Sequence, residues 1–232
     1  MQGLCVGRLN FDLFGGFGLL PFITLVAFDV ETTGLEADKE DIIELAGVKF
    51  TLERKDGKLT CKEVSQFQSM VKPTKLIPEE ATRINKITNQ MVEDAPDLKS
   101  VLQNFFRFCG LSSVLVAHNA EFDAKFLAKG IRKHGLIMPQ HPVVDSLKFV
   151  RKLLPEYSSH RLGEVARKLG TQTNLALNQA DLHRATYDCI VLMEVFAACL
   201  RKRYQDKDLL MDCALKSLES LHGPSLRFTQ FA

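Results

Sequence analysis

The chain has 232 residues, 46% of them hydrophobic, which is enough for one sizeable core with at most a small appendage. Charged residues make up 25% and the net charge is +2, so a histone-like positive coat is excluded and any contact with nucleic acid must come from a local patch. The six cysteines form no C-x-x-C pair, which argues against a disulfide framework or a zinc site and favours free thiols in a reducing cytosol.

The N-terminal segment, residues 1–20, has the apolar character of a short export signal but lacks its other features. Arg8 is the one basic residue before the apolar stretch, Pro21 interrupts it, and no small-x-small cleavage site precedes the first predicted strand. The stretch is also too short and broken to span a bilayer. We therefore expect residues 1–20 to form an extension on a cytoplasmic protein that makes no contact with a membrane.

The next part of the chain predicts three antiparallel strands. Residues 22–29 are enriched in aromatic and β-branched side chains, and residues 41–53 continue as a second strand. The sequence KDGK at 55–58 is typical of a tight hairpin, because Asp-Gly adopts the positive φ angles that such a turn requires. Residues 59–73 are then expected to pair as the third strand.

Helical patterns and short apolar runs alternate through the rest of the chain. The run at 113–119 and the start of 142–154 are typical of strands in a covered sheet. Helices are expected at 78–85, 97–110, 120–135, the remainder of 142–154, 159–170, about 181–203 and 206–221. This order predicts an α/β fold, in which a mixed sheet flanked by helices spans residues 21–204 and a C-terminal helix and tail follow at 205–232.

Two carboxylates stand at the end of the first predicted strand, in the sequence VAFDVETTGL. Side chains alternate along a strand, so Asp29 and Glu31 point the same way, roughly 6–7 Å apart, while Val30 points into apolar packing. Two buried acids repel each other and are poorly hydrated. Mg²⁺ or Mn²⁺, which prefer oxygen ligands, would relieve both penalties. The alternative is that one acid is a solvated edge residue and the other caps a turn.

Further acids fall where α/β sheets gather ligands. Asp123 lies in the first turn of the helix that follows the apolar run at 113–119, and such junctions of strand and helix form ligand sites. A carboxylate at this place also complements the helix dipole, which is the alternative for Asp123 and our interpretation of Glu121. Asp145 is expected to cap the helix after the last short strand.

A histidine and an acid occur together at the start of the last long predicted helix. His183 and Asp188 are five residues apart, a spacing that turns two helical side chains about 140° away from each other. They can face one centre if His183 sits at or before the helix start. A mobile histidine beside an anchored Asp188 suits a general base next to a metal ligand. The alternative for His183 is a capping or surface residue.

Three of these stretches together resemble the DEDDh 3′–5′ exonucleases, a family that includes RNase T and the proofreading epsilon subunit of bacterial DNA polymerase III. They are FDVETTGL at 28–35, AHNAEFDAKFL at 117–127 and DLHRATYD at 181–188. The resemblance covers about residues 24–200 and departs from the family's pattern at INKIT, 84–88, where relatives often carry His-Gly. It implies an RNase H-like fold with a mixed five-stranded sheet.

The resemblance also implies a metal-dependent enzyme that releases nucleoside 5′-monophosphates from 3′ ends. Two Mg²⁺ or Mn²⁺ ions about 4 Å apart would clamp the scissile phosphate. Asp29 would bridge both ions, with Glu31 and Asp188 completing one coordination shell. Asp123 would hold the second ion, directly or through water. His183 would take the proton from the attacking water.

Residues around these motifs are candidates for contacts with the terminal nucleotide. Thr32 and Thr33 offer hydroxyl and backbone donors to the 3′ end, and Leu35 could wedge against the last base. The residues near Asp123 that could line the same pocket are His118, Asn119 and Phe122. For Leu35 and Phe122 the alternative is ordinary core packing.

The sequence leaves the substrate and partners open. Single-stranded or frayed 3′ ends of DNA are favoured, because FDVETTGL is closest to proofreading-type motifs, and RNA trimming of the RNase T kind is the alternative. A homodimer and a DNA polymerase subunit are candidate partners, with the C-terminal LRFTQFA either docking on a partner or fraying. A catalytically silent module that binds nucleic acid or protein is the alternative from another class.

Overall fold

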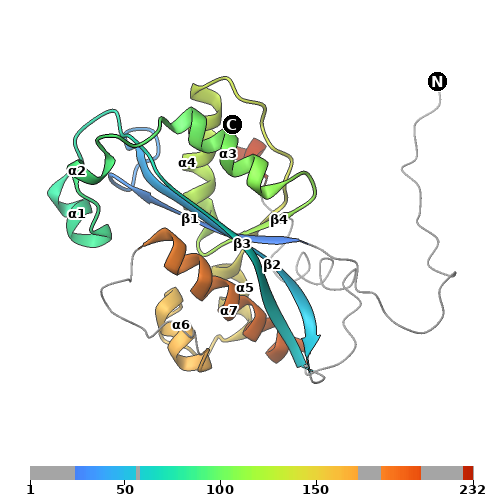
Figure 1. Cartoon of the computed structure of the whole chain (residues 1–232). Helices are drawn as coiled ribbons and strands as arrows, with labels where there is room; N and C mark the ends of the chain where they lie inside the picture. The colour runs from blue at the N-terminus through green and yellow to red at the C-terminus, as the bar shows by residue number, and fades with distance from the viewer. Residues whose placement is uncertain (1–23, 56–57, 172–183, 205–226, 232) are drawn as a thin grey trace, which may run out of the picture.

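Five strands form one mixed sheet in the computed structural model (Figure 1). From one edge to the other the strands are β3 (Lys58–Met70), β2 (Ile42–Lys55), β1 (Leu25–Thr32), β4 (Val114–Ala117) and β5 (Val143–Asp145). β2 pairs antiparallel with β1 and β3, whereas β4 runs parallel to β1 and β5. The predicted α/β class, with three antiparallel strands followed by parallel ones, is confirmed. The structure describes residues 24–55, 58–171, 184–204 and 227–231.

The helices form two layers and one small cluster around this sheet. In Figure 1, α3 and α4 lie on one face, α5, α6 and α7 lie on the other, and α1 and α2 lie beyond one end of the strands. Their bounds are α1 Glu79–Asn85, α2 Asn89–Val92, α3 Leu98–Cys109, α4 Ala120–Lys133, α5 Ser146–Leu153, α6 Leu162–Leu169, α7 Ala185–Tyr204 and the 3-10 helix η1 Phe228–Phe231. Among the described residues, no helix is long and apolar enough to cross a bilayer.

Most of the expected elements are present, with shifted ends. β1 continues to Thr32, so Glu31 lies within the strand, and the predicted cap of α5 is confirmed by a 3.0 Å hydrogen bond from the Leu147 amide to Asp145 Oδ1. The short helix α2 was not expected. The predicted N-terminal extension, the start of the last long helix and the helix at 206–221 lie outside the described residues.

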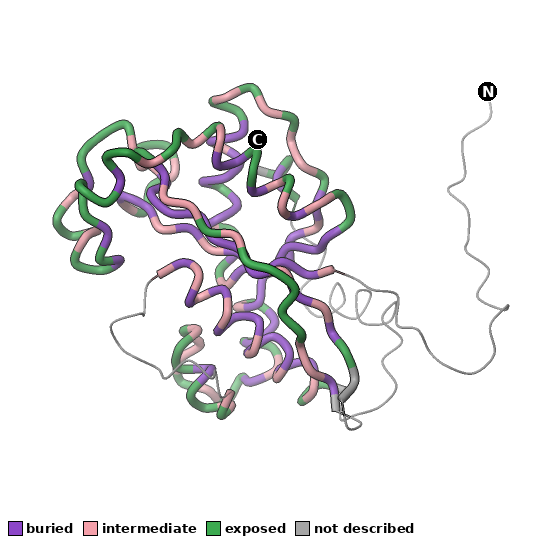
Figure 2. The backbone as a smooth tube through the Cα atoms, in the orientation of Figure 1, coloured by how far each residue is buried: buried purple, intermediate pink, exposed green. Residues whose placement is uncertain are grey.

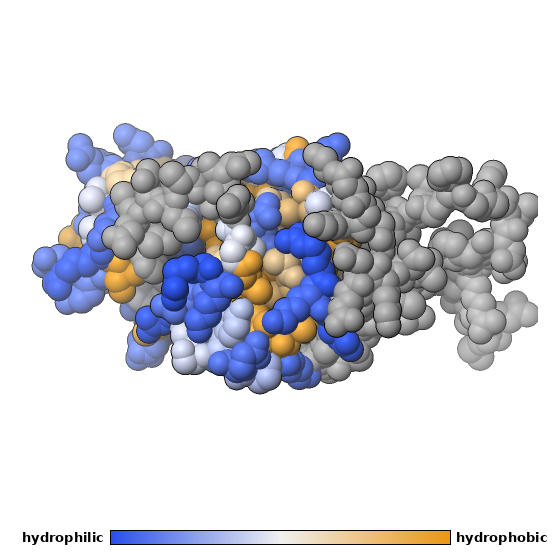
Figure 3. All heavy atoms as spheres, turned by 90° about the horizontal axis from the view of Figure 1, so that it is seen from below, coloured by the Kyte–Doolittle hydropathy of each residue, from blue (hydrophilic) through white to orange (hydrophobic). Residues whose placement is uncertain are grey.

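Successive side chains of β1 point to opposite faces of the sheet and therefore belong to two different hydrophobic cores. Val26, Phe28 and Val30 pack against residues of α3 and α4, including Phe105. Leu25 and Ala27 belong instead to the core formed with α5, α6 and α7. Figure 2 shows that the central strands and the sheet-facing side of α7 are buried. Seen from below (Figure 3), the described outer surface is largely hydrophilic, with smaller hydrophobic areas between.

Phe228, in the described C-terminal residues 227–231, differs from both expectations for the tail. Phe228, in the sequence LRFTQFA, is fully buried within the chain's own core and meets Phe106 edge-on, with 5.8 Å between the ring centroids. The Arg227 guanidinium also donates a hydrogen bond to the carbonyl of Gln140. Phe228 is therefore neither a frayed residue nor a side chain available to a partner, because burial of its ring in this core stabilises the docked segment.

Candidate active site

Asp29 and Glu31 lie near the carboxyl end of β1, on the face that α7 covers. Their partners across the antiparallel pairing are Ala46 and Glu44 of β2. The two acids thus continue the row that begins with Leu25 and Ala27 inside the core, where the strand reaches the edge of the apolar packing. Each keeps some contact with solvent, although most of its surroundings are protein.

A third carboxylate completes a cluster with these two. Asp188, in the first turn of α7, brings an oxygen to within 4.8 Å of carboxylate oxygens of both Asp29 and Glu31. The donor set consists of carboxylate oxygens alone and is partly open to solvent, which suits a hard divalent cation such as Mg²⁺ or Mn²⁺. The neighbouring thiol of Cys189 is buried, which raises its pKa and keeps it neutral.

Asp123 reaches the cluster from the start of α4, a different helix from the one that carries Asp188. It is buried in the first turn of α4, and its Oδ1 accepts a 3.1 Å hydrogen bond from the backbone amide of Val30, the residue between the two acids of β1. This bond joins the start of α4 to the end of β1. The negative charge of Asp123 is the largest cause, after burial, of the raised pKa of Asp29.

The pKa of each of these four carboxyl groups is raised above its ordinary value. Burial is the main cause for all four, and repulsion from neighbouring carboxylates, including those of Glu44 and Asp145, adds to it. The pKa rises to about 9 for Glu31, to about 8 for Asp123 and to about 6 for Asp188, and it is raised strongly for Asp29. Without a cation, Glu31 and Asp123 therefore hold protons near neutral pH.

The predicted base cannot be placed, because His183 lies outside the described residues. Its sequence neighbour Arg184 is described and precedes α7, which begins at Ala185. Asp188 follows one turn later and donates its backbone amide to the carbonyl of Arg184 at 3.1 Å. The role of His183 as a base stays a prediction.

A cavity of about 480 Å³ adjoins Glu31. Its walls come from the end of β1, the turn after it, α1 and the first turn of α4, and most of the wall is apolar. The lining residues are Val30, Glu31, Thr32, Thr33, Gly34, Leu35, Pro78, Glu80, Ala81, Ile84, Asn85 and Phe122. Four of the six residues predicted to contact a terminal nucleotide are among them, and Leu35 is 85% exposed at the rim.

The hydroxyl groups of the two threonines are used within the protein. Thr32 Oγ1 donates to the carbonyl of Gly34 at 2.7 Å, and Thr33 Oγ1 donates to Glu40 Oε2 at 2.6 Å while accepting from the Asp41 amide at 2.9 Å. A Cβ on Gly34 would lie 2.8 Å from Glu40 Cδ, so a side chain there would displace the Glu40 side chain that holds Thr33. These contacts fix the turn that carries Leu35, so the threonines shape the cavity wall.

The other two predicted contact residues, His118 and Asn119, lie away from this cavity. The His118 ring is held between Ser146 Oγ at 2.9 Å and the carbonyl of His160 at 2.8 Å, and burial lowers its pKa. A carbonyl accepts, so Nε2 is the donor and Nδ1 accepts from the serine hydroxyl. Asn119 has a left-handed φ of 72°, and its backbone N–H donates a hydrogen bond to Asp145 Oδ1 at 3.2 Å. Both residues brace the junction of β4, α4 and α5.

Sequence reasoning missed Glu44 and Asn85. Glu44 of β2 is completely buried next to the cluster, directly opposite Glu31 in the β1–β2 pairing. A lone acid within the apolar run IIELAGV, at 42–48, was the available signal, of the same kind that drew attention to Asp29. Asn85 lines the cavity, and its side chain donates to the carbonyl of Thr32 at 3.4 Å and accepts from the Ile87 amide at 3.0 Å.

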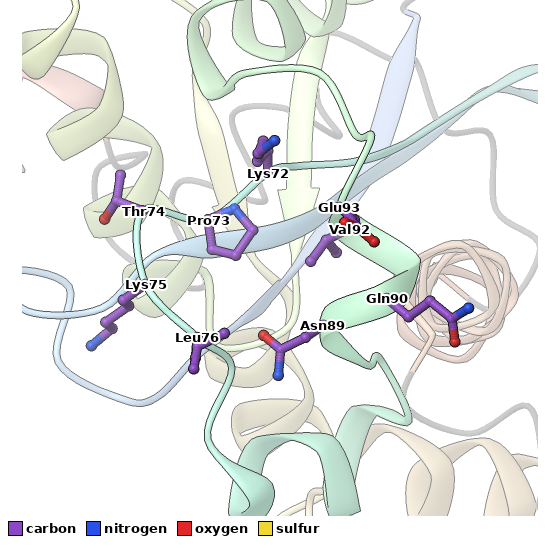
Figure 4. A pocket seen from close by; sticks show the side chains of 9 residues that line it. All are labelled: Lys72, Pro73, Thr74, Lys75, Leu76, Asn89, Gln90, Val92 and Glu93. Atoms are coloured by element: carbon purple, nitrogen blue, oxygen red, sulfur yellow. The ribbon is translucent and has the colours of Figure 1, made fainter.

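A larger hollow of about 640 Å³ lies between the loop after β3 and helix α2 (Figure 4). One wall is formed by residues 72–76 and the other by Asn89, Gln90, Val92 and Glu93. None of the four clustered carboxylates lines it, whereas Glu31 lines the smaller cavity. The smaller cavity is therefore the one placed to present a ligand to the carboxylates.

Comparison with known sequences points to one family. A model of the RNase T family, described as exonuclease, matches residues 26–196. The DNA polymerase III PolC-type of Oceanobacillus iheyensis is 41% identical over 165 residues, which is 71% of this chain and 10% of that protein. The corresponding protein of Bacillus cereus is 36% identical over 198 residues, or 84% of this chain and 13% of that protein. The chain thus spans about a tenth of the length of these curated relatives.

Comparison with solved structures gives the same fold. Exonuclease X in complex with a 5′-overhanging duplex DNA is similar with a TM-score of 0.56 and 26% identity, covering 85% of this chain and 97% of that one. Escherichia coli exonuclease I in complex with single-stranded DNA gives a TM-score of 0.62 at 17% identity, covering 84% of this chain and 43% of that one. These likenesses bear out the expected RNase H-like sheet.

Proposed function

Because this chain belongs to the RNase T family of exonucleases, we propose that it is a metal-dependent 3′–5′ exonuclease that acts on DNA. The single observation that carries the proposal is the cluster of Asp29, Glu31 and Asp188, whose oxygens lie within 4.8 Å of one another beside an apolar-walled cavity. Such a cluster raises the pKa of its own members and is therefore costly in a protein that has no cation to bind.

The carboxylates are the residues that would hold the divalent ions. Asp29, Glu31 and Asp188 would do so directly, with Asp123 beside them on the opposite side of β1. Mg²⁺ is the proposed physiological ion and Mn²⁺ a substitute, because both prefer oxygen donors. Bound divalent ions stabilise charge on a phosphoryl group and lower the pKa of the attacking water. His183 would accept the proton of that water, in keeping with its place five residues before Asp188.

The cavity beside Glu31 would take the terminal nucleoside. Its walls are largely apolar, and Leu35, Ile84 and Phe122 offer surfaces on which a base can stack. The backbone of the turn after β1 is fixed by the Thr32 and Thr33 hydroxyls, so the wall is preformed. A preformed wall places the last phosphodiester at the carboxylates each time a strand end enters.

DNA is proposed over RNA because the matching relatives are DNA polymerases and the similar solved exonucleases hold DNA. Because the matching relatives are DNA polymerases of the PolC type, a proofreading role together with a DNA polymerase is part of the proposal. A single-stranded or frayed 3′ end is the expected substrate form. A homodimer stays a prediction from the sequence resemblance.

The test uses one DNA oligonucleotide labelled at the 5′ end and its RNA counterpart, each incubated with Mg²⁺. We expect a ladder of DNA products shortened from the 3′ end, slower digestion of the RNA, and loss of both in Asp29→Ala. The catalytically silent alternative predicts intact strands with the wild type as well, together with retained binding in a gel-shift measurement. Products that shorten equally fast with wild type and Asp29→Ala would refute the proposed site.

A further inference from the structure

The fifth carboxylate near the cluster, Glu44, belongs to a different kind of arrangement. Its side chain is completely buried, and its two oxygens accept four hydrogen bonds. Oε1 accepts from Gln68 Nε2 at 2.6 Å and from Arg184 Nη2 at 2.9 Å. Oε2 accepts from Arg184 Nε at 3.3 Å and from the backbone amide of Ala185 at 3.2 Å. A carboxylate has about four acceptor positions, so none of Glu44's remains for a cation.

These bonds join β2 to the first residue of α7. The amide of Ala185 is one of the helix-starting N–H groups that have no partner inside the helix, and Glu44 supplies that partner from the sheet. The Arg184 guanidinium is held by both its Nε and its Nη2, a two-point contact that also fixes orientation. The start of α7 is therefore held at two consecutive residues.

The position of Asp188 follows from this attachment. Its backbone amide bonds to the carbonyl of Arg184 at 3.1 Å, so it lies one turn from the residues that Glu44 holds. Glu44 in turn stands directly opposite Glu31 in the β1–β2 pairing. One buried side chain thus links the start of the helix that carries Asp188 to the strand that pairs with the one carrying the other two acids.

The charge of Arg184 compensates that of Glu44, whose carboxylate, in addition to burial, raises the pKa of Asp29, Glu31 and Asp188. Arg184 supplies the positive charge that a buried carboxylate requires, and removal of either member of a buried pair leaves the other uncompensated. The Arg184 side chain is 31% exposed and Glu44 is not exposed at all. Substitution at Arg184 therefore disturbs the pair from its solvent side, with less risk to folding than substitution at Glu44.

We infer that Glu44, paired with Arg184, is a positioning residue that fixes Asp188 against Asp29 and Glu31 for cation binding. The inference rests on the proposed metal-dependent function. Partners that orient metal ligands without touching the metal typically change metal affinity or activity 10–100-fold when they are replaced. The pair acts through the position of α7, and neither residue lines the cavity beside Glu31.

The experiment compares Glu44→Gln, Arg184→Gln and Arg184→Lys with the wild type and with the control Gln68→Ala. Gln68 also bonds to Glu44, but it lies on β3 and makes no bond of its own to α7 among those described. Mn²⁺ binding is measured without substrate by titration calorimetry. Steady-state kcat and KM are then measured on a single-stranded DNA, and folding is checked by thermal melting.

We expect Glu44→Gln and Arg184→Gln to weaken Mn²⁺ binding at least about 10-fold and to lower kcat to a similar extent, with KM for the DNA changed less than about threefold. Arg184→Lys keeps the charge but loses the two-point contact, so it should recover part of the loss. Gln68→Ala should bind Mn²⁺ within about twofold of the wild type, because the bonds to α7 are intact.

Wild-type Mn²⁺ affinity in a folded Glu44→Gln, or in Arg184→Gln if Glu44→Gln does not fold, would overturn the inference. An equal loss in Gln68→Ala would also overturn it, because the effect would then come from any disturbance of Glu44. Failure of the wild type to shorten DNA would instead count against the proposed function. The Mn²⁺ titration distinguishes the two failures, since it requires no turnover.

Discussion

The two faces of β1 carry opposite kinds of side chain at neighbouring positions. Toward α3 and α4, Phe28 packs in a group of aromatic rings. The ring centroids of Phe28 and Phe105 are 6.1 Å apart, and those of Phe67 and Phe105 are 5.6 Å apart. Toward α7, the next residue is Asp29, followed by Glu31 on the same face. Consecutive residues of one strand therefore contribute to a stabilising core and to a cluster of like charges.

This difference separates stability from function within the sheet. Burial of aromatic side chains on the α3–α4 face stabilises the fold, and edge-on ring pairs add to the effect of burial. On the α7 face the raised pKa values of the acids indicate that their charged forms are destabilised. Substitutions on the two faces should therefore move activity and stability in different directions.

The largest expected effect is on activity, at Glu31. Glu31→Gln keeps the shape of the side chain and removes one charge, so kcat should fall at least about a thousandfold, equivalent to ~4 kcal/mol. In the metal-free fold Glu31 is mostly protonated at pH 8, and Gln removes the cost of taking up that proton, so the melting temperature at pH 8 should rise by about 2–4 °C. Glu164→Gln, on the outside of α6, serves as the control and should change neither quantity. A folded Glu31→Gln with the wild-type kcat would contradict the assignment of the α7 face of β1 to function.

The reverse pattern is expected on the opposite face. Phe228→Ala removes a fully buried ring that meets Phe106, and the free energy of unfolding should fall by about 3–5 kcal/mol in urea denaturation. The kcat per folded molecule should stay unchanged, because η1 packs on α4 and Phe228 lies in the α3–α4 core, on the other side of the sheet from α7. Leu111→Ala, at a fully exposed position, should shift stability by less than about 0.5 kcal/mol. Equal effects of the two substitutions would show that the tail is not part of the core.

The sequence predicted the acidic face better than the aromatic one, for a physical reason. Asp29 and Glu31 could be recognised because a period of two and a strand enriched in apolar residues are local features. Phe228 could not be assigned to the core, since its ring partner Phe106 lies about 120 residues away along the chain. The packing of a short terminal segment depends on such distant contacts.

The site was predicted in the same uneven way. Asp123 and Asp188 belong to helix starts that the apolar pattern indicates, and the structure brings both toward β1. His118 was expected in the cavity because it precedes Asp123 in the chain, but the bonds that hold its ring to α5 and to the carbonyl of His160 depend on tertiary packing. The hydrogen bonds of Glu44 to Arg184 and Ala185 span about 140 residues and gave no local signal.

The pH dependence of stability sharpens the comparison on the charged face. The folded-state pKa of Glu31, Asp123 and Asp188 lies above the ordinary carboxylate value of about 4, so folding takes up protons. Their contribution to stability is therefore complete below about pH 4 and is lost as the pH rises through about 6, 8 and 9. Millimolar Mg²⁺ should offset this loss, raising the melting temperature by about 3 °C or more at pH 8.5 and by less at pH 6.

The control for this effect is Phe228→Ala, which should lower the melting temperature equally at both pH values because no titrating group of the cluster is changed. The difference between the two pH values should shrink in Glu31→Gln, which lacks one of the raised groups. An Mg²⁺ effect that is independent of pH would mean that the ion binds elsewhere than at these carboxylates.

The smallest expected effect is at the end of β1, where an apolar side chain belongs to neither face. Leu35 is 85% exposed at the rim of the cavity beside Glu31, and no core cluster of the described residues contains it. Leu35→Ala should raise KM for single-stranded DNA by about fivefold, equivalent to ~1 kcal/mol of lost stacking, with the melting temperature unchanged.

Ile137→Ala provides a matched control for Leu35→Ala. Ile137 is 95% exposed and follows the far end of α4, a helix of 14 residues and so about 21 Å long, whose first turn carries Asp123. The KM of Ile137→Ala for single-stranded DNA should equal that of the wild type. An unchanged KM for Leu35→Ala, or an equal change for both variants, would mean that strand ends enter the site without using this rim. The apolar wall would then extend to Ile84 and Phe122 alone.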